Sequence, residues 1–169
     1  MENHNPYLLY LKQLTDEAQT VKYHLDREFF AKFASDQIVD GCVDVGIDIR
    51  KNASDACLCL DFDGVIDIIC DRCCNTMPLH IDTKENVVVK FQAEYPDNKN
   101  DTILADAKTG VLDISDYMFE TLILQIPIQN FHREGECNPA MIDKLKKYLK
   151  EPEKSRSDPR WEALKNINK

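Results

Sequence analysis

The chain has 169 residues, of which 43% are hydrophobic and 30% are charged, and its formal net charge is −9 at pH 7. This length suits one domain with its own core and is too short for two comfortable ones, and no apolar run approaches the ~20 residues that cross a bilayer. The N-terminus has no basic region followed by an apolar stretch, so no secretory signal is expected and the sequence favours the cytoplasm.

The first part of the chain is expected to form two strands and a short helix. Residues 6–14 and 19–25 are short apolar or alternating runs with a polar segment between them, which predicts an opening pair of strands. Residues 26–33 place three aromatic side chains at helical spacing, enough for about two turns. These side chains are Phe29, Phe30 and Phe33.

Three long alternating segments follow with little between them: 37–51, 56–73 and 79–95. Alternation in the first segment requires a slip near Gly41, which is typical of a β-bulge. Long strands with short connections predict an antiparallel meander, and the acidic residues that alternate with apolar ones indicate a solvated sheet face rather than a catalytic carboxylate pair. Three cysteines at alternating positions are expected to pack in the interior: Cys42, Cys57 and Cys59.

Helical spacing appears later in the chain. A polar loop over 95–110 leads to a predicted helix over 112–127, with Asp113 as its N-cap and Pro127 as its end. A turn-rich segment then precedes a short basic helix over 138–150, which has a proline near its start.

The last residues are expected to be a linker, 151–157, and a final helix, 158–169, with Asp158 as its N-cap. The predicted fold class is therefore α+β, with an antiparallel sheet of long meandering strands and helices mainly in the C-terminal half. The predicted organisation is a single α+β domain over 1–150, followed by the linker and a basic C-terminal helix over 151–169.

The charge is unevenly distributed along the chain. From Met141 to the end there are nine Lys and Arg residues against five acids, so this part carries +4 and residues 1–140 carry −13. An acidic body repels nucleic acid phosphates and attracts basic partners, whereas a basic tail does the reverse. A solvated helix face explains the tail lysines about equally well.

Catalytic motifs are not found. The chain has four histidines, and none lies in a G-x-S-x-G or H-E-x-x-H pattern. With five glycines, the chain also lacks a glycine-rich phosphate loop. We therefore expect no enzymatic activity, no small-molecule substrate and no membrane association.

Seven cysteines in a reducing compartment are expected to be thiols or metal ligands rather than disulfides. Cys70 and Cys73 form a C-x-x-C at the turn between two long strands, a spacing that lets two thiolates meet one tetrahedral zinc ion. His132 and Cys137 could complete a Cys3His set if the two turns meet at one end of the sheet. The cofactor expectation is accordingly none, or one structural zinc ion.

Two other interpretations of the C-x-x-C remain. A redox pair is disfavoured because no helix begins there to lower a thiol pKa. Small buried residues, or the remnant of a site, are about as well supported as metal binding.

Several basic residues are candidates for contact with RNA or a protein partner. Arg72 lies within the C-x-x-C turn and Arg133 lies beside His132, and both are donors suited to phosphate or carboxylate. Basic residues of the C-terminal part complete the set: Lys144, Lys146, Lys147, Lys150, Arg156, Arg160 and Lys165.

The order of these features resembles the YceD family, the large ribosomal RNA subunit accumulation proteins. The resemblance covers roughly Ile38 to the end and rests on four motifs in a shared order. Many members carry two cysteines in the later segment, whereas this chain has one. The matching residues are Cys70-Asp71-Arg72-Cys73, Leu112-Asp113, the segment from Glu120 to Pro127, Cys137, and the segment from Asp158 to Leu164.

The resemblance implies a cytoplasmic, non-enzymatic factor of bacterial ribosome biogenesis that supports synthesis, processing or stability of the large-subunit (23S) rRNA. Its expected partners are that rRNA or its precursor, and a ribosomal protein or assembly factor of the large subunit. The alternative is an acidic interaction module that holds a basic large-subunit ribosomal protein without touching RNA.

Overall fold

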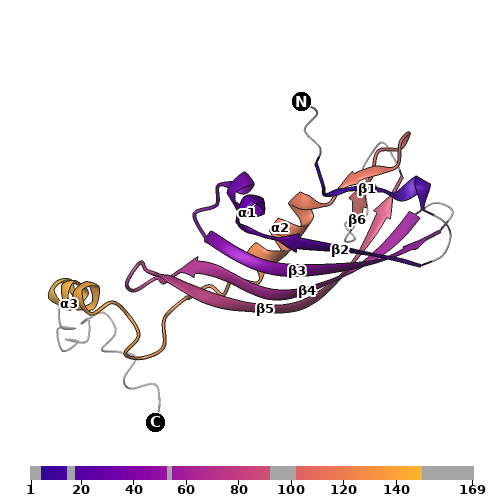
Figure 1. The fold of residues 1–169 in the computed structure, drawn as a ribbon. Helices are drawn as coiled ribbons and strands as arrows, with labels where there is room; N and C mark the ends of the chain where they lie inside the picture. Colours follow the sequence, from indigo (N-terminus) through magenta and orange to yellow (C-terminus); the bar gives the residue numbers. More distant parts are fainter. Residues whose placement is uncertain (1–4, 15–17, 53–54, 92–101, 150–169) are drawn as a thin grey trace, which may run out of the picture.

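A computed structural model describes residues 5–14, 18–52, 55–91 and 102–149. Within these ranges the fold is α+β, as predicted, and two of the three α-helices lie in the C-terminal half (Figure 1). The elements in chain order are β1 Leu8–Tyr10, the 3-10 helix η1 Leu11–Gln13, β2 Gln19–Leu25, α1 Arg27–Phe33, β3 Ile38–Lys51, β4 Asp55–Ile69, β5 Thr76–Lys90, β6 Thr102–Leu104, β7 Val111–Asp113, α2 Ser115–Leu124 and α3 Pro139–Tyr148.

The main sheet has five strands in the order β2-β3-β4-β5-β6 and curves strongly along its length. Strands β2 to β5 are antiparallel neighbours, which confirms the predicted meander. The register between β3 and β4 shifts between Ile38 and Asp40, close to the slip expected near Gly41. Because the strands are long and their connections short, each side chain's face is fixed by its position in the alternation.

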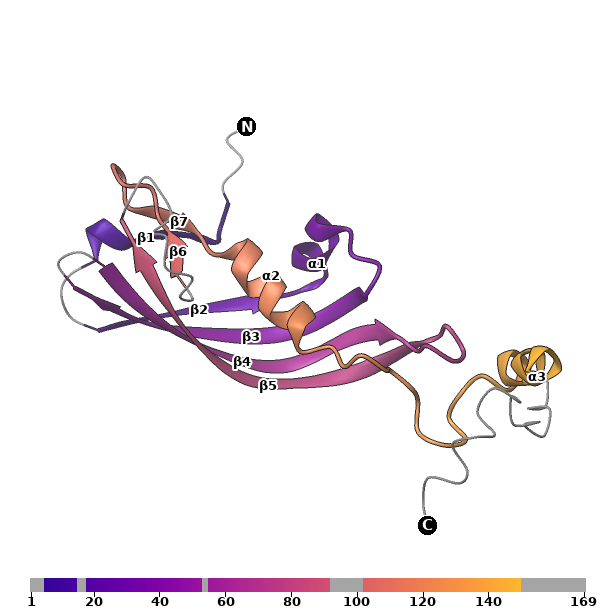
Figure 2. The same ribbon diagram turned by 180° about the vertical axis from the view of Figure 1, so that it is seen from behind.

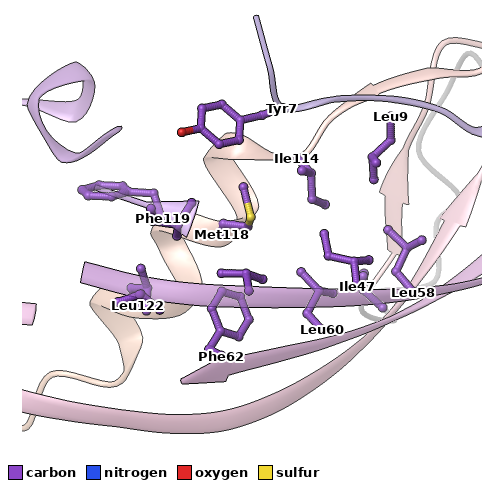
Figure 3. Packing of buried hydrophobic residues seen from close by; sticks show 14 of the residues in the cluster. Tyr7, Leu9, Ile47, Leu58, Leu60, Phe62, Ile114, Met118, Phe119 and Leu122 are labelled. Carbon is purple, nitrogen blue, oxygen red and sulfur yellow. The ribbon is translucent and has the colours of Figure 1, made fainter. Parts of the chain in front are cut away.

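The prediction that the first two strands pair with each other is wrong. Both strands form, but β1 pairs with β7 and β2 pairs with β3. The turn into η1 ends β1 after three residues, so the first strand never reaches the second. The apolar side chain of Leu9 instead faces the main core from a two-stranded ribbon above the sheet (Figure 3).

The segment around 102–115 also differs from expectation. The predicted polar loop contains β6, which pairs in parallel with the end of β5. Asp113 ends β7 instead of occupying the N-cap position, which Ile114 takes. Its carboxylate still supports the helix start, because Oδ1 accepts hydrogen bonds from the Ser115 backbone N–H at 3.0 Å and from Ser115 Oγ at 2.6 Å. The helix ends at Leu124, before Pro127.

Helices α1 and α2 cover one face of the curved sheet and enclose the core (Figures 1 and 2). The Asp26 carboxylate caps the N-terminus of α1 by accepting hydrogen bonds from the Glu28 and Phe29 N–H groups. Phe33 of α1 stacks on Phe119 of α2 with ring centroids 4.0 Å apart, so the two helices also hold each other. Each fully buried apolar side chain contributes roughly 1.5–3 kcal/mol relative to exposure.

The opposite face of the sheet carries exposed and acidic side chains. Asp44, Asp63 and Asp82 lie directly opposite one another across β3, β4 and β5, so three carboxylates form one row. His24 Nδ1 lies 2.7 Å from Asp44 Oδ1 at one end of the row. In the described part of the chain, no helix is both long and apolar enough to span a membrane.

The expectation that Cys42, Cys57 and Cys59 pack in the interior is wrong. Cys42 and Cys57 are exposed, and Cys59 is half-buried. All three lie on the acidic face because their positions alternate with the buried positions of β3 and β4. The linker and last helix expected over 151–169 lie outside the described residues, and the domain boundary at 150 stays a prediction.

Candidate metal centre

The turn between β4 and β5 places two cysteine thiols side by side. The backbone closes on itself through hydrogen bonds from the Cys74 N–H to the Cys70 carbonyl and from the Cys70 N–H to the Asn75 carbonyl, both 2.9 Å. Cys74 takes a left-handed conformation, with φ 58°, to complete the turn. As a result Cys70 and Cys73 are both buried, while Cys74 is exposed.

The segment after α2 is attached to this turn by two hydrogen bonds between Asp71 and Asn130, one between backbone groups and one to the Asp71 carboxylate. The Asp71 N–H donates to the Asn130 carbonyl at 2.8 Å, and the Asn130 N–H donates to Asp71 Oδ2 at 2.7 Å. This clamp brings His132 and Cys137 to the C-x-x-C, although they follow it by about sixty residues in the chain. The two turns therefore meet at one end of the sheet, which is the condition that a Cys3His set requires.

The four side chains have the spacing of a tetrahedral metal site. Their ligand atoms all lie within 4.8 Å of one another. Cys70 Sγ is 4.0 Å from Cys137 Sγ, and His132 Nδ1 is 3.4 Å from Cys73 Sγ and 3.9 Å from Cys137 Sγ. A tetrahedral zinc ion with ordinary bond lengths requires about 3.8 Å between sulfurs and about 3.6 Å between sulfur and nitrogen. The donor set therefore fits a zinc ion.

The orientation of His132 is also that of a ligand. Its Nε2 lies 3.2 Å from the Thr76 carbonyl oxygen, so this nitrogen donates its proton there and Nδ1 is left with a free lone pair toward the sulfurs. Histidines that bind metals commonly donate their other ring N–H to a carbonyl or carboxylate in this way. Thr76 opens β5, so the imidazole is held by the sheet itself.

Backbone N–H groups favour thiolate at the C-x-x-C. Burial raises the pKa of Cys70, but hydrogen bonds from the N–H groups of Cys73, His132 and Arg72, together with the His132 side chain, bring it down to about 6. The pKa of Cys73 is also lowered, chiefly by the N–H of Asn138.

The other two ligands shift in the opposite direction. Burial raises the pKa of Cys137, and the hydrogen bond to Cys70 raises the pKa of His132. Cysteine and histidine must be deprotonated at the ligand atom to bind a metal. A divalent cation among these four groups would offset the negative charge of the thiolates.

Thiol labelling should separate the two classes of cysteine. We expect iodoacetamide to modify Cys42, Cys57 and Cys74 first, because these are exposed, and to leave Cys70 and Cys73 unmodified until a chelator is added. Peptide mass spectrometry of the labelled chain measures each rate. Labelling of Cys70 as fast as that of Cys57, before chelation, would contradict the centre.

Three of the nine predicted basic contact residues lie together beside this candidate centre. Arg72, Arg133 and Lys146 border one depression of about 380 Å³ next to Cys137, together with the acids Glu134 and Asp143. The Arg72 guanidinium carbon lies 4.4 Å from the centre of the Phe131 ring, a cation–π contact that positions it. Lys144 and Lys147 are exposed on α3, and the remaining candidates lie outside the described residues: Lys150, Arg156, Arg160 and Lys165.

Helix α3 has no buried residue and lies beyond the end of the sheet, next to the centre (Figure 2). The Asn138 side chain caps it by accepting from the Ala140 N–H at 3.1 Å. In the chain α3 follows the segment that carries His132 and Cys137, and Arg72 of the β4–β5 turn borders the same depression as Lys146 of α3.

Sequence reasoning missed the residues that support the ligands. Thr76 accepts from His132, Asp71 clamps the second segment, and Phe131 holds Arg72. Asp71 is next to Cys70 and Arg72, and Phe131 is next to His132, all of which were predicted site residues. This adjacency was the only sign in the sequence that Asp71 and Phe131 support the site. Thr76 acts through its backbone carbonyl, which no residue type reveals.

Comparison with known proteins gives one match. The model of a family described as "Large ribosomal RNA subunit accumulation protein YceD" matches residues 58–168, which is more than half of the chain. The matched region begins in β4 and includes all four candidate ligands. Neither the curated proteins nor the solved structures include a significant match to this chain.

Proposed function

Because the chain belongs to the YceD family, whose description names accumulation of large-subunit ribosomal RNA, we propose that it is a non-enzymatic cytoplasmic factor that supports synthesis, processing or stability of the 23S rRNA. The observation that carries the proposal is the family match over the region that contains the Cys3His cluster and its basic border. The rRNA or its precursor is the proposed partner, together with proteins of the large subunit.

The proposed RNA contact is the depression bordered by Arg72, Arg133 and Lys146. A planar guanidinium binds phosphate with two parallel hydrogen bonds, and an ammonium adds a point charge. Lys144 and Lys147 of α3 extend the same surface. In the proposed arrangement, residues 151–169 are a linker and a basic helix, and Lys150, Arg156, Arg160 and Lys165 add to the contact.

The proposed cofactor is one structural zinc ion held by Cys70, Cys73, His132 and Cys137. When bound, it supplies a rigid cross-link and no reaction, because four protein ligands leave no open position for a water or substrate. The two turns that it joins carry Arg72 and Arg133. The ion would therefore fix the distance between the two arginines that contact phosphate.

RNA binding should fall steeply with salt. We expect a transcript of precursor 23S rRNA to bind the full chain with an affinity that drops between about 50 and 200 mM salt, and each arginine removed should lower the slope of log affinity against log salt by roughly 0.7–0.9. Filter binding of Arg72→Ala and Arg133→Ala measures this. Lys22→Ala, on the opposite sheet face near Asp44, is the matched control, and it should leave the slope unchanged.

A second candidate function is favoured by the acidic face. A hollow beside the row Asp44, Asp63 and Asp82 is lined by Asp44, Asp61 and Asp63 against one lysine, Lys22, and Asp61 is paired with Lys84. The remaining negative charge would suit lysine or arginine side chains of a partner. The chain would then hold a basic large-subunit ribosomal protein and never touch RNA. Affinity capture with and without nuclease separates the two candidates: a partner lost on nuclease treatment supports RNA contact, and one that persists supports the holder.

A further inference from the structure

A groove of about 550 Å³ lies between the end of α2, the end of β4 and the connection from α1 to β3. Its lining includes Ile126, Pro127, Ile128 and Asn130, which belong to the segment that leads from α2 toward the candidate metal centre (Figure 2 shows the path of this segment). Its wall is mixed: the polar residues Asp36, Gln37, Asp71 and Asn130 share it with seven apolar ones, Ile68, Ile69, Ile123, Leu124, Ile126, Pro127 and Ile128.

Two of these wall residues are exposed to an unusual degree. Ile128 is 100% exposed and Leu124 is 80% exposed, whereas Leu122, two positions earlier on the same helix, is fully buried. Large aliphatic side chains are among the residues most often found inside proteins. A pair of them at the edge of a partly apolar groove is the pattern of a binding surface, whereas a single exposed aliphatic residue is ordinary.

The charges of the groove select what can bind there. Its charged lining residues are Asp36 and Asp71, and no Lys or Arg lines it. A nucleic acid phosphate would be repelled, and the apolar residues of the wall would find no partner on a phosphate backbone. A polypeptide with both aliphatic and basic side chains satisfies the wall and the acids together.

The C-x-x-C turn separates this groove from the basic depression. Asp71 lines the groove, and its neighbour Arg72 lines the depression. Adjacent residues of one turn thus serve two surfaces of opposite charge. RNA on one side of the turn and a basic protein segment on the other would not compete for space or charge.

We propose that this groove binds a short segment of a basic large-subunit ribosomal protein. The segment places aliphatic side chains against Leu124 and Ile128, and a lysine or arginine beside Asp36. This rests on the proposed function for the class of partner, and the groove's own shape and charge specify the segment. It differs from the holder above in using this groove and not the acidic sheet face.

The test uses the full chain, immobilised, and an RNA-free mixture of ribosomal proteins extracted from purified large subunits. We expect the chain to retain a basic protein, and we expect Ile128→Asp or Leu124→Asp to lower the retained amount at least about tenfold, with a smaller loss for Asp36→Asn. Tyr148→Asp, which changes an 84% exposed aromatic side chain on α3, is the matched control and should leave retention unchanged. Because Ile128 is fully exposed, its substitution should not alter the unfolding temperature, and a thermal melt checks this.

A photo-crosslinker at position 128 identifies the occupant. A crosslink to a segment of the retained basic protein that contains aliphatic and basic residues supports the proposal. Crosslinks to RNA, to a second copy, or to residues 150–169 of the same chain would overturn it, as would no retention or unchanged retention by Ile128→Asp. Those outcomes would not contradict the proposed function. A different measurement would contradict it, namely unchanged 23S rRNA levels in cells that lack the chain.

Discussion

Replacing Cys70 with serine is expected to abolish zinc binding, lowering the metal content from about one ion per chain to less than about a tenth of that. Cys70 is fully buried and its sulfur lies 4.0 Å from that of Cys137. Burial raises its pKa, but three backbone N–H groups and the His132 side chain bring the pKa down to about 6. A serine hydroxyl in the same place cannot ionise at neutral pH. The remaining three ligands would leave the coordination of a structural site incomplete.

The effect on structure should be local. The core between the sheet and helices α1 and α2 contains none of the four ligands, so the main unfolding transition should be retained. The segment from His132 through α3 depends on the cross-link and should lose its fixed position, seen as faster amide exchange over 131–148.

Atomic absorption of the purified protein and hydrogen exchange by mass spectrometry measure these two effects. Cys74→Ser is the matched control, since Cys74 is in the same turn but exposed and outside the cluster. Equal zinc content in Cys70→Ser and Cys74→Ser would show that Cys70 does not bind the ion.

Replacing Gly64 with alanine is expected to destabilise the fold by about 3 kcal/mol, the cost of inserting an atom into a packed interior that cannot relax. A Cβ at position 64 would meet the carbonyl oxygen of Cys42 and would lie 2.6 Å from Val43 Cα. These are backbone atoms of the neighbouring strand, which cannot rotate away as a side chain can. The two strands would have to separate in the middle of the sheet.

Gly46→Ala provides the matched control on the strand next to β4. A Cβ there meets nothing within 4 Å, so its stability should equal or slightly exceed that of the original chain. Urea denaturation followed by circular dichroism measures both. For a chain of this size, about 3 kcal/mol corresponds to a lowering of the unfolding temperature by roughly 6–12 °C. A loss in Gly46→Ala equal to that in Gly64→Ala would contradict the argument from close strand approach.

The meander was predictable because its information is local. Alternation over 37–51 and 56–73 specifies which residues face the core, and short connections make neighbours in sequence neighbours in the sheet. The pairing of β1 with β7 was not predictable, because two three-residue strands separated by about a hundred residues carry no alternation long enough to identify a partner. The same limit hid β6.

The exposed cysteines show a different limit. Cysteine behaves as a small hydrophobe, so hydropathy alone placed Cys57 and Cys59 inside. Odd and even positions of β4 face opposite sides of the sheet. Cys57 and Cys59 are on the same side as Asp61, whereas Leu58 and Leu60 face the core. The odd or even position of a residue along a strand can be counted in the sequence, and it is a better guide to burial than the residue type.

The candidate centre was predictable by chemistry and not by spacing. Structural zinc sites are most often completed by cysteine and histidine, and Cys137 is the one cysteine in the later part of the chain, with His132 five residues before it. That the pairs actually meet depends on the clamp between Asp71 and Asn130 and on the path of α2 over the sheet, which are tertiary features.

The row of Asp44, Asp63 and Asp82 places three carboxylates opposite one another, with His24 beside Asp44 and Lys84 close enough to Asp82 to attract it. Like charges directly opposite one another on a sheet are destabilising, and within the described residues no salt bridge neutralises Asp63 or Asp82. The buried hydrophobic face of the sheet keeps β3, β4 and β5 paired, although the carboxylates on the exposed face repel one another. A cation-rich molecule bound along this row would relieve the repulsion between the carboxylates, so its binding should raise the stability of the sheet.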